Sequence, residues 1–327
     1  MVLCHIDTEF YIEHITFMVK YFLGWCINLS RIEFIHVVTN NSCNLRCPMC
    51  FIPGGQRALK LNDGILNDLS QMKINGAIVQ GGEVLVYPPA IDFVLNLRNN
   101  NPEAEISLVT NGTLLRSNAR VVSQMKLKKA FVSMDAASNT VYTICRGNAD
   151  LFNNALDGIK MLISLGVEVI VLYIVSKPSL EEIIEANELY SSIGVNKIRL
   201  DPLCRGADLD IYNSWKLDNN DRLNEILSEL PEENIIDASR VTTHGELLQQ
   251  KMQDKPPCPS FWNQVLVDAD GGVKICCGNS NIIGNLNNNT IEKILSNDNL
   301  KEIQELAIQK NYGKAGCMLS CTYLTGS

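Results

Sequence analysis

Short apolar runs alternate with amphipathic segments between residues 33 and 202, and this alternation limits the possible folds more than any other feature of the chain. The runs are rich in Val, Ile and Leu, as expected of strands buried on both faces, and cover 34–39, 77–80, 106–110, 130–134, 168–175 and 197–200. The clearest helix between them begins at Ser179, has Glu182 three positions later as in a capping box, and ends at Gly194. Strands that alternate with helices form a parallel sheet, because parallel neighbours need crossover connections. The pattern predicts an α/β fold, and six units rather than eight indicate a partial (β/α)6 TIM-like barrel, with a flat doubly wound sheet as the alternative.

A different pattern follows in the last quarter of the chain. Residues 264–269 and 273–276 predict two short strands joined by an Asp270-Gly271-Gly272 turn, and a helix is expected over 291–309. These elements predict a small C-terminal domain built from a β-hairpin and a helix.

The boundaries of the chain's parts follow from changes in composition. The strand and helix alternation stops after Pro202, and the polar stretch that follows, with one helix expected near 218–230, ends at the Pro256-Pro257 pair. We therefore expect an N-terminal helical extension (1–32), the partial barrel (33–202), a connecting segment (203–257) and the C-terminal domain (258–327).

Charge and hydropathy exclude several classes of protein. The chain has 28 basic and 36 acidic residues, so its net charge of −8 argues against an extended nucleic-acid-binding surface. No apolar stretch reaches the ~20 residues of a transmembrane span, and acidic residues near the N-terminus argue against a signal peptide. Apolar residues over 12–25 keep a helical period, which predicts a helix docked on the domain. A membrane-surface helix is the alternative, and it is disfavoured because the polar face lacks an excess of Lys and Arg.

Cysteine usage points to metal chemistry. The chain has 12 cysteines, and most fall into two groups, one at 43–50 and one at 258–321. Clustered cysteines in a long chain without an export signal indicate metal or iron–sulfur ligation in a reducing compartment, so we expect a cytoplasmic protein.

The first group has the spacing C-x3-C-x2-C and comprises Cys43, Cys47 and Cys50, in the loop after the first predicted strand. Three thiolates can each bind one iron of a [4Fe–4S] cube and leave the fourth iron without a protein ligand. A structural zinc site is the alternative, but it needs four ligands, and no fourth Cys or His follows nearby.

This loop, with Phe51 directly after Cys50, resembles the signature of the radical S-adenosylmethionine (radical SAM) superfamily. Motifs at successive strand ends agree with the resemblance, although each alone also fits an ordinary turn or helix cap: Gly81-Gly82-Glu83, Thr110-Asn111-Gly112, Ser133-Met134-Asp135 and Arg146-Gly147. The resemblance implies that SAM is bound by Gly81, Gly82, Glu83, Asn111, Ser133, Asp135 and Arg146, with Glu83 at the methionine amino group and Arg146 near the carboxylate.

The resemblance also implies a reaction. SAM would bind the vacant iron, accept an electron that originates from an external donor such as flavodoxin or ferredoxin, and break into methionine and a 5′-deoxyadenosyl radical. That radical would abstract hydrogen from the substrate, while the protein binds, orients and excludes water.

The second group resembles the SPASM/twitch extension of radical SAM enzymes, which holds auxiliary [4Fe–4S] clusters. The resemblance implies one auxiliary cluster, as in the shorter twitch form, held by Cys258, Cys276, Cys317 and Cys321. Cys277 is the alternative to Cys276, because adjacent side chains in a strand point to opposite faces. A Cys4 zinc site has the same ligands and is the competing interpretation. A fully ligated cluster would accept an electron from the substrate radical or help to position the substrate, which favours net oxidation.

Residues at the end of the sixth predicted strand are candidates for completing the reaction. Asp201 is a candidate base, although it also fits a cap before Pro202, and Arg199 and Arg205 are candidates for binding a polar substrate. Cys204, and less so Cys145, could donate a hydrogen atom to a substrate radical.

We therefore expect an oxidative radical SAM enzyme that dehydrogenates a small molecule or crosslinks a peptide. A barrel that starts near residue 33 leaves no room for an N-terminal leader-peptide recognition domain, which we expect to weaken the peptide version. The alternatives are a redox-neutral epimerase that uses Cys204 and, outside enzymes, a zinc-stabilised binding module.

Overall fold

The computed structural model describes residues 32–52, 56–204, 208–237 and 257–317 of the 327-residue chain. Its centre is a curved parallel sheet whose first six strands pair in chain order. They are β1 (Phe34–Val38), β2 (Gly76–Gln80), β3 (Glu105–Thr110), β4 (Lys129–Ser133), β5 (Glu168–Val175) and β6 (Lys197–Pro202). Each of the six strands expected from the sequence is therefore confirmed, with bounds that shift by at most two residues.

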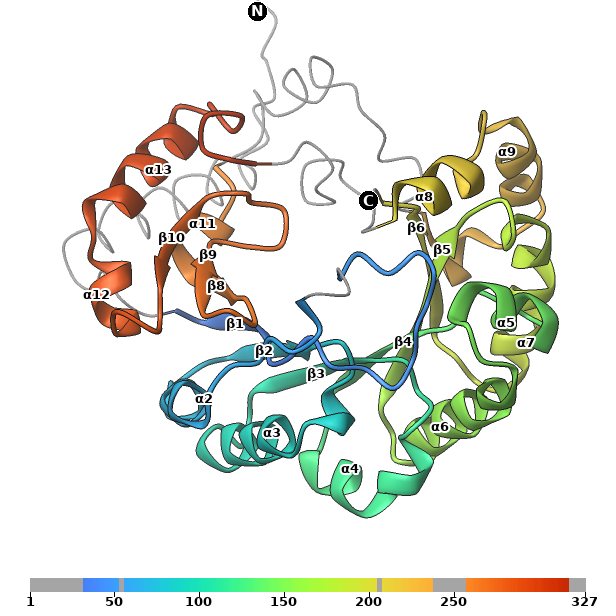
Figure 1. Cartoon of the computed structure of the whole chain (residues 1–327), viewed down its shortest axis with the longest axis horizontal. Coiled ribbons are helices and arrows are strands. Elements are labelled where there is room, and N and C mark those ends of the chain that lie inside the picture. The colour runs from blue at the N-terminus through green and yellow to red at the C-terminus, as the bar shows by residue number, and fades with distance from the viewer. Residues whose placement is uncertain (1–31, 53–55, 205–207, 238–256, 318–327) are drawn as a thin grey trace, which may run out of the picture.

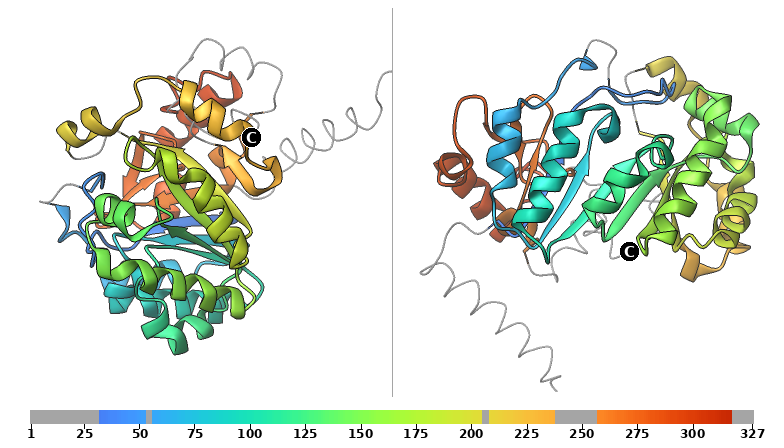
Figure 2. Two further views of the ribbon diagram at one scale, coloured as in Figure 1. Left: turned by 90° about the vertical axis from the view of Figure 1, so that its right-hand side faces the viewer. Right: turned by 90° about the horizontal axis from the view of Figure 1, so that it is seen from below.

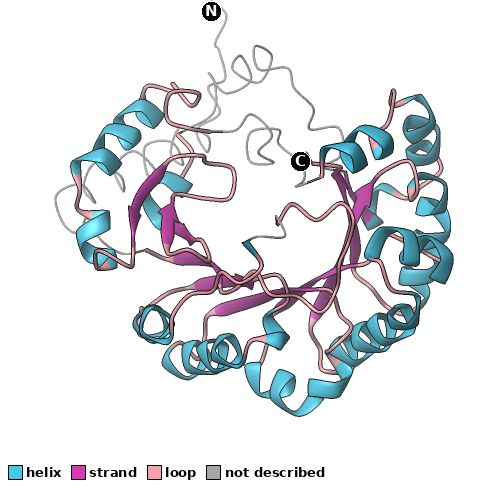
Figure 3. Cartoon of the chain, in the orientation of Figure 1, coloured by secondary structure: helices cyan, strands magenta, loops and turns pink. Residues whose placement is uncertain are grey.

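Helices cover the outer face of this sheet (Figures 1 and 3). They are α2 (Asp63–Ser70), α3 (Pro88–Asn100), α4 (Ala119–Met125), α5 (Asn139–Arg146), α6 (Phe152–Ser164) and α7 (Ile183–Ser192). Alternate strand residues such as Ile35 and Val37 are fully buried and belong to the same hydrophobic core as Leu66 and Leu69 of α2. The view from below in Figure 2 shows these helices side by side along the strands, following chain order from blue to green.

Four further strands extend the sheet at both edges, giving the order β10-β9-β8-β1-β2-β3-β4-β5-β6-β7. β7 (Ile235–Asp237) pairs with β6, while β8 (Gln264–Val267), β9 (Gly272–Lys274) and β10 (Ile282–Asn285) follow one another outward from β1. The first and last strands of this order are not paired with each other, so the barrel is open. This confirms the partial barrel, and it shows that the expected C-terminal hairpin is a continuation of the barrel sheet.

The helix expected to begin at Ser179 starts later and is capped differently. Residues Leu180–Glu182 form a 3₁₀ turn before α7, and the Ser179 hydroxyl accepts from Ser176 N and donates to Ile174 O. The Glu182 carboxylate accepts hydrogen bonds from the backbone N–H groups of Ala137 and Ser138, far along the chain. The predicted capping box is wrong because the Ser179 hydroxyl bonds to residues that precede it and the Glu182 carboxylate has distant partners.

The C-terminal helix is also divided. In place of one helix over 291–309, the structure has α12 (Ile291–Leu295) and α13 (Asp298–Ile308). The break occurs because the Asn297 side chain accepts from Leu300 N and caps a new helix. The helix expected near 218–230 is α9 (Asp221–Ser228), preceded by α8 (Leu209–Trp215), and α11 (Ser260–Asn263) leads into β8.

Some expectations concern residues outside the described part of the chain. These are the N-terminal helix over 12–25, Arg205 and Cys321. Within the described part, no helix is both long and apolar enough to cross a membrane.

A substitution of Arg98 tests whether its hydrogen bonds stabilise the packing of α3 against α4. This buried residue of α3 donates to four backbone carbonyls, those of Met125, Lys126, Asn101 and Pro102. We expect Arg98→Met to lower the free energy of unfolding by about 3 kcal/mol, because it leaves buried carbonyls without partners. Urea unfolding would measure this.

The matched control is Arg120→Met, at an exposed position of α4. It should change stability by less than about 0.5 kcal/mol. Equal effects of the two substitutions would contradict a structural role for the Arg98 hydrogen bonds.

Candidate active site

The loop that follows β1 carries Cys43, Cys47 and Cys50 across the carboxyl ends of the barrel strands (Figures 1 and 2). Its base is closed by a β-bridge between Asn40 and Lys60 and by a hydrogen bond from Asn41 N to Leu59 O. The loop therefore leaves the sheet and returns at one fixed point.

The three cysteine side chains lie half-buried within this loop. Burial raises the pKa of the Cys43 and Cys47 thiols, and neighbouring sulfurs add to this effect, Cys47 on Cys43 and Cys50 on Cys47. Donors also reach the sulfurs, with Leu45 N 3.4 Å and Asn111 Nδ2 3.7 Å from Cys43 Sγ. The loop thus carries three sulfurs, and the two N–H donors beside Cys43 favour its thiolate form.

Gly81 and Gly82 lie against the start of the cysteine loop. Gly82 N donates to Asn40 O, and Glu83 N donates to Ser42 O. A Cβ at Gly82 would lie 2.5 Å from the carbonyl oxygens of both Asn41 and Ser42, and one at Gly81 would lie 2.5 Å from Asn40 Oδ1. Glycine is required here because two backbone segments are in direct contact.

Glu83 is fully buried, and its carboxylate is hydrogen-bonded to other groups of the protein. The carboxylate accepts from Leu85 N, from the Thr110 hydroxyl and from Asn111 N. Burial raises its pKa, while these hydrogen bonds act in the opposite direction. Glu83 therefore joins the ends of β2 and β3, and its contact with SAM stays a prediction.

Asn111 connects the end of β3 to the cysteine loop. Besides its contact with Cys43, its Nδ2 donates to Asn44 Oδ1 at 2.9 Å, and its Oδ1 accepts from Thr113 N and Oγ1. Sequence reasoning missed Asn44 as well as the buried Asn40, whose amide donates to Ser42 O and Glu83 O. The available signal was their position, since Asn40 is a polar residue two positions after β1 and Asn44 directly follows the predicted ligand Cys43.

The predicted SAM contacts on β4 and α5 meet in one place. Asp135 and Arg146 form an ion pair of 2.5 Å, with side chains 0% and 10% exposed, and Arg146 Nη1 lies 3.9 Å from Cys47 Sγ. Ser133, at the end of β4, is half-buried. The structure thus brings Asp135 and Arg146 together with the cysteine loop.

The C-terminal cysteines lie around the β8–β9 hairpin. Cys258 is buried just before α11, and Cys276 and Cys277 follow β9, with Cys276 half-buried and Cys277 exposed. Cys317 forms a β-bridge with Asn279, whose side-chain amide lies 3.9 Å from Cys317 Sγ. The smaller exposure of Cys276 agrees with its choice as the ligand, although that assignment stays a prediction.

The candidates for completing the reaction differ in accessibility. Asp201 is half-buried and ion-paired with Arg199 at 2.9 Å, and burial raises its pKa despite this partner. Cys204 is exposed just beyond β6, whereas Cys145 is fully buried, with its pKa raised to about 12 mainly by burial. Cys204 is therefore the accessible thiol of the two.

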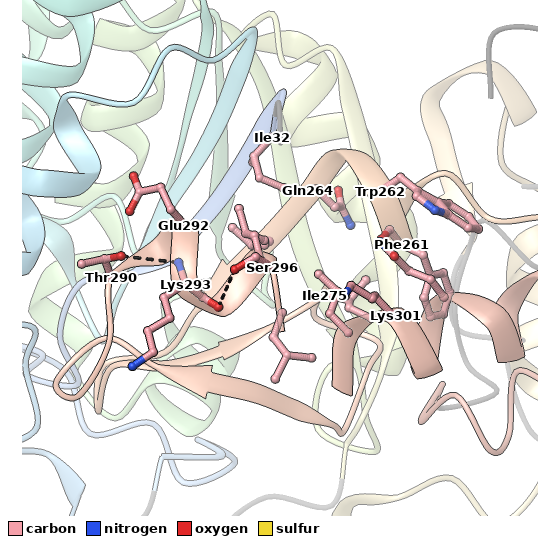
Figure 4. Close-up of a pocket in the computed structure, with 15 residues that line it drawn as sticks. Ile32, Phe261, Trp262, Gln264, Ile275, Thr290, Glu292, Lys293, Ser296 and Lys301 are labelled. Carbon is pink, nitrogen blue, oxygen red and sulfur yellow. Dashed lines mark hydrogen bonds between the residues drawn. The ribbon is translucent and has the colours of Figure 1, made fainter. Parts of the chain in front are cut away.

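A cavity of about 760 Å³ lies in the C-terminal part, away from these groups. Its walls come from β8, β10, the helices α11 to α13 and Ile275, which directly follows β9. Figure 4 shows the aromatic rings of Phe261 and Trp262 at one end and Glu292 and Lys293 at the other. None of the predicted site residues lines it, so it plays no part in the site.

The residues at the strand ends fit a thiolate-bound iron–sulfur cluster. Three half-buried sulfurs share one loop, and the buried Arg146 next to them has an Nε–H without a hydrogen-bond partner within the described part of the chain. No three His, Cys, Asp or Glu side chains in that part converge closely enough to hold a single metal ion, and a four-iron cube is larger than one ion. An α/β barrel with such a loop and a cysteine-bearing extension defines an iron–sulfur enzyme.

Comparison with known proteins identifies the family. The model of the radical SAM superfamily matches residues 37–196, and that of the SPASM iron–sulfur cluster-binding domain matches residues 258–322. The chain belongs to the radical SAM superfamily and has a C-terminal SPASM domain. It is an enzyme whose cofactors are [4Fe–4S] clusters and SAM, which sets aside the zinc-stabilised binding module.

Two of the sequence relatives are named GTP 3′,8-cyclases. A probable GTP 3′,8-cyclase of Saccharolobus solfataricus is 27% identical over 175 residues, which is 52% of this chain and 56% of the relative. A GTP 3′,8-cyclase of Crocosphaera subtropica is 23% identical over 243 residues, covering 69% of this chain and 66% of that protein. The chain thus spans about half the length of the archaeal relative.

The solved structures with this fold include enzymes bound to peptides. SuiB of Streptococcus suis bound to its precursor peptide SuiA matches with a TM-score of 0.62 and 13% identity, covering 92% of this chain and 73% of SuiB. The enzyme anSMEcpe with AdoMet and a peptide matches with a TM-score of 0.61 and 17% identity, covering 85% of this chain and 84% of that one. Both confirm the fold.

The contact at Gly82 can be tested by adding one methyl group. We expect Gly82→Ala to lower stability by about 2 kcal/mol, because the methyl group clashes with two carbonyl oxygens. The cysteine loop should shift, so iron bound after anaerobic reconstitution should fall as well.

Gly313→Ala is the matched control, because a Cβ there would meet nothing within 4 Å. Iron and sulfide assays together with thermal unfolding compare the two proteins. Full iron loading of Gly82→Ala would show that the loop tolerates displacement from the second strand end.

Proposed function

We propose that this enzyme cleaves SAM reductively and oxidises its substrate after hydrogen abstraction. The observation that carries the proposal is the pairing of a three-cysteine loop at the strand ends with a cysteine-bearing C-terminal domain on the same sheet. The first group leaves one iron open for SAM, and the second has enough thiols to close a cluster completely.

The chain's own residues would perform binding, orientation and shielding. Cys43, Cys47 and Cys50 would hold the SAM-binding cluster, and Asn111, Glu83 and Gly82 fix the loop that carries them. When bound, the cluster and SAM together supply a radical able to abstract hydrogen from an unactivated C–H bond. Ser133 and Arg146 would contact SAM beside that loop.

Net oxidation also needs groups that take an electron and a proton from the substrate. Cys258, Cys276, Cys317 and Cys321 would hold the auxiliary cluster, whose role would be to accept the electron. Asp201 Oδ would accept the proton, because its half-buried carboxylate lies at the end of β6. Its ion pair with Arg199 would keep the side chain oriented toward that edge.

A peptide is the substrate class we propose. Two solved structures that share the fold over 85–92% of this chain, SuiB and anSMEcpe, contain bound peptides. Charge is consistent with this choice: Arg146 beside the cysteine loop and Arg199 at the end of β6 are each ion-paired with a carboxylate, so neither cation is free to bind a triphosphate.

A redox-neutral epimerisation is the second candidate, favoured by the exposure of Cys204 beyond β6. A substrate radical could take a hydrogen atom from this thiol on the opposite face, which would invert the stereocentre and leave a thiyl radical on Cys204. One electron from the external flavodoxin or ferredoxin donor and one proton from solvent would restore the thiol. This route would need no electron acceptor.

The cellular setting follows from the cofactors. Oxygen-sensitive clusters and thiols need a reducing compartment, so we propose a cytoplasmic enzyme that receives electrons from a flavodoxin or ferredoxin. Its acidic charge disfavours a nucleic-acid partner.

Cysteine substitutions separate the roles of the two groups. We expect Cys47→Ala to reduce formation of 5′-deoxyadenosine to background, because the SAM-binding cluster loses a ligand. Cys317→Ala should keep uncoupled SAM cleavage and lose product. Chromatography with mass detection on anaerobically reconstituted, dithionite-reduced protein measures both, and wild-type behaviour of the two variants would refute the two-cluster arrangement.

Product mass distinguishes the candidate reactions. We expect peptides encoded beside the gene to lose two hydrogens when they are incubated in D2O with the enzyme, SAM and dithionite. Deuterium gain at a retained C–H, lost in Cys204→Ala, would instead identify an epimerase. Consumption of GTP in a parallel incubation would overturn the peptide assignment.

A further inference from the structure

Three side chains from separate elements meet beside the cysteine loop. Arg146 is the last residue of α5, Asp135 follows β4, and Cys47 lies in the loop after β1. Arg146 Nη2 pairs with Asp135 Oδ2 at 2.5 Å, and Nη1 lies 3.9 Å from Cys47 Sγ. The guanidinium thus bridges a buried carboxylate and a predicted cluster ligand.

The backbone at Asp135 is strained in a way that serves this arrangement. Its φ of 59° lies in the left-handed region, which residues other than glycine seldom adopt. Two interactions hold the side chain in place: Oδ1 accepts from Ile174 N at 2.7 Å, and Oδ2 pairs with Arg146. Such conformations persist where the surroundings fix them, and they are frequent at functional sites.

The end of α5 is held against the loop as well. Gly147 ends the helix with a φ of 80°, and a Cβ there would lie 3.1 Å from the Arg46 carbonyl oxygen, one residue before Cys47. Gly147 N donates to Thr143 O. The helix end and the loop are therefore in backbone contact, which leaves the guanidinium little freedom to move away from Cys47.

We propose that Asp135 and Arg146 are positioning residues that hold a fixed positive charge against Cys47 and thereby set the reduction potential of the SAM-binding cluster. The inference rests on the proposed function. A buried positive charge beside a sulfur ligand stabilises the reduced cluster, which is the more negative state. Asp135 orients the guanidinium and offsets part of its charge.

Because Arg146 and Asp135 carry opposite charges, we expect their neutral variants to shift the reduction potential in opposite directions. Arg146→Gln removes the positive charge and should shift the potential to more negative values. Asp135→Asn removes the negative charge and should shift it to more positive values. Arg146→Lys keeps the charge and should remain closer to wild type than Arg146→Gln. A merely structural role predicts shifts in the same direction for both residues, because each substitution would loosen the loop.

The experiment is a redox titration of the reconstituted full chain without substrate, followed by electron paramagnetic resonance. The signal that changes when SAM is added identifies the relevant cluster. Arg116→Gln, at an exposed position before α4, is the matched control and should leave the potential unchanged.

Opposite shifts for Asp135→Asn and Arg146→Gln would support the proposal. If both variants shift the potential in the same direction, or neither shifts it, the proposal is refuted. The proposed function would still stand in that case, provided that the wild-type cluster binds SAM and is reduced. If Arg146→Gln does not assemble a cluster, Asp135→Asn decides the question, because a negative shift or no shift there refutes the proposal. A wild-type protein without any SAM-responsive cluster would instead refute the proposed function.

Discussion

The close approach of two backbone segments at the ends of β1 and β2 is the contact on which the site depends. Gly81 and Gly82 touch the segment that enters the cysteine loop, and Glu83 fixes the next strand end from within the protein. A side chain at either glycine would separate these segments, and the three sulfurs would lose their common position. The chain thus places cofactor ligands on a loop but fixes that loop by backbone hydrogen bonds at its base.

Much of the fold could be predicted from sequence because its strands are rich in Val, Ile and Leu and bury alternate side chains in one core. The run at 169–175 is continuous in apolar residues and lies in β5, whereas the run at 197–200 alternates Lys197 and Arg199 with Ile198 and Leu200 and lies in β6. β7 and β10 were missed because one is three residues long and the other contains Gly284, so neither shows a clear period. The capping box at Ser179 failed because Glu182 has a tertiary partner, which a local pattern does not reveal.

Of the candidate site, the cysteine ligands could be predicted from sequence, but the contacts around them could not. Spacing alone indicated Cys43, Cys47 and Cys50, because ligands of one cluster must be close in sequence when they share a loop. The pairing of Asp135 with Arg146 was not predictable, since it depends on how β4 and α5 pack. Both had been assigned only to SAM, yet the structure places them against each other and against a cysteine. Asn40 and Asn44 were missed because their positions, near a strand end and beside a cysteine, do not reveal which tertiary partners their amides bind.

The parallel pairing of β8 with β1 fixes where the C-terminal hairpin lies relative to the first cysteine group. The register joins Phe34 to Gln264 and Val37 to Val267, so the strand that leads to the first group is hydrogen-bonded to the strand that begins the hairpin. A sheet ladder therefore anchors the hairpin to the barrel, and a longer or shorter connecting segment would leave this anchor in place.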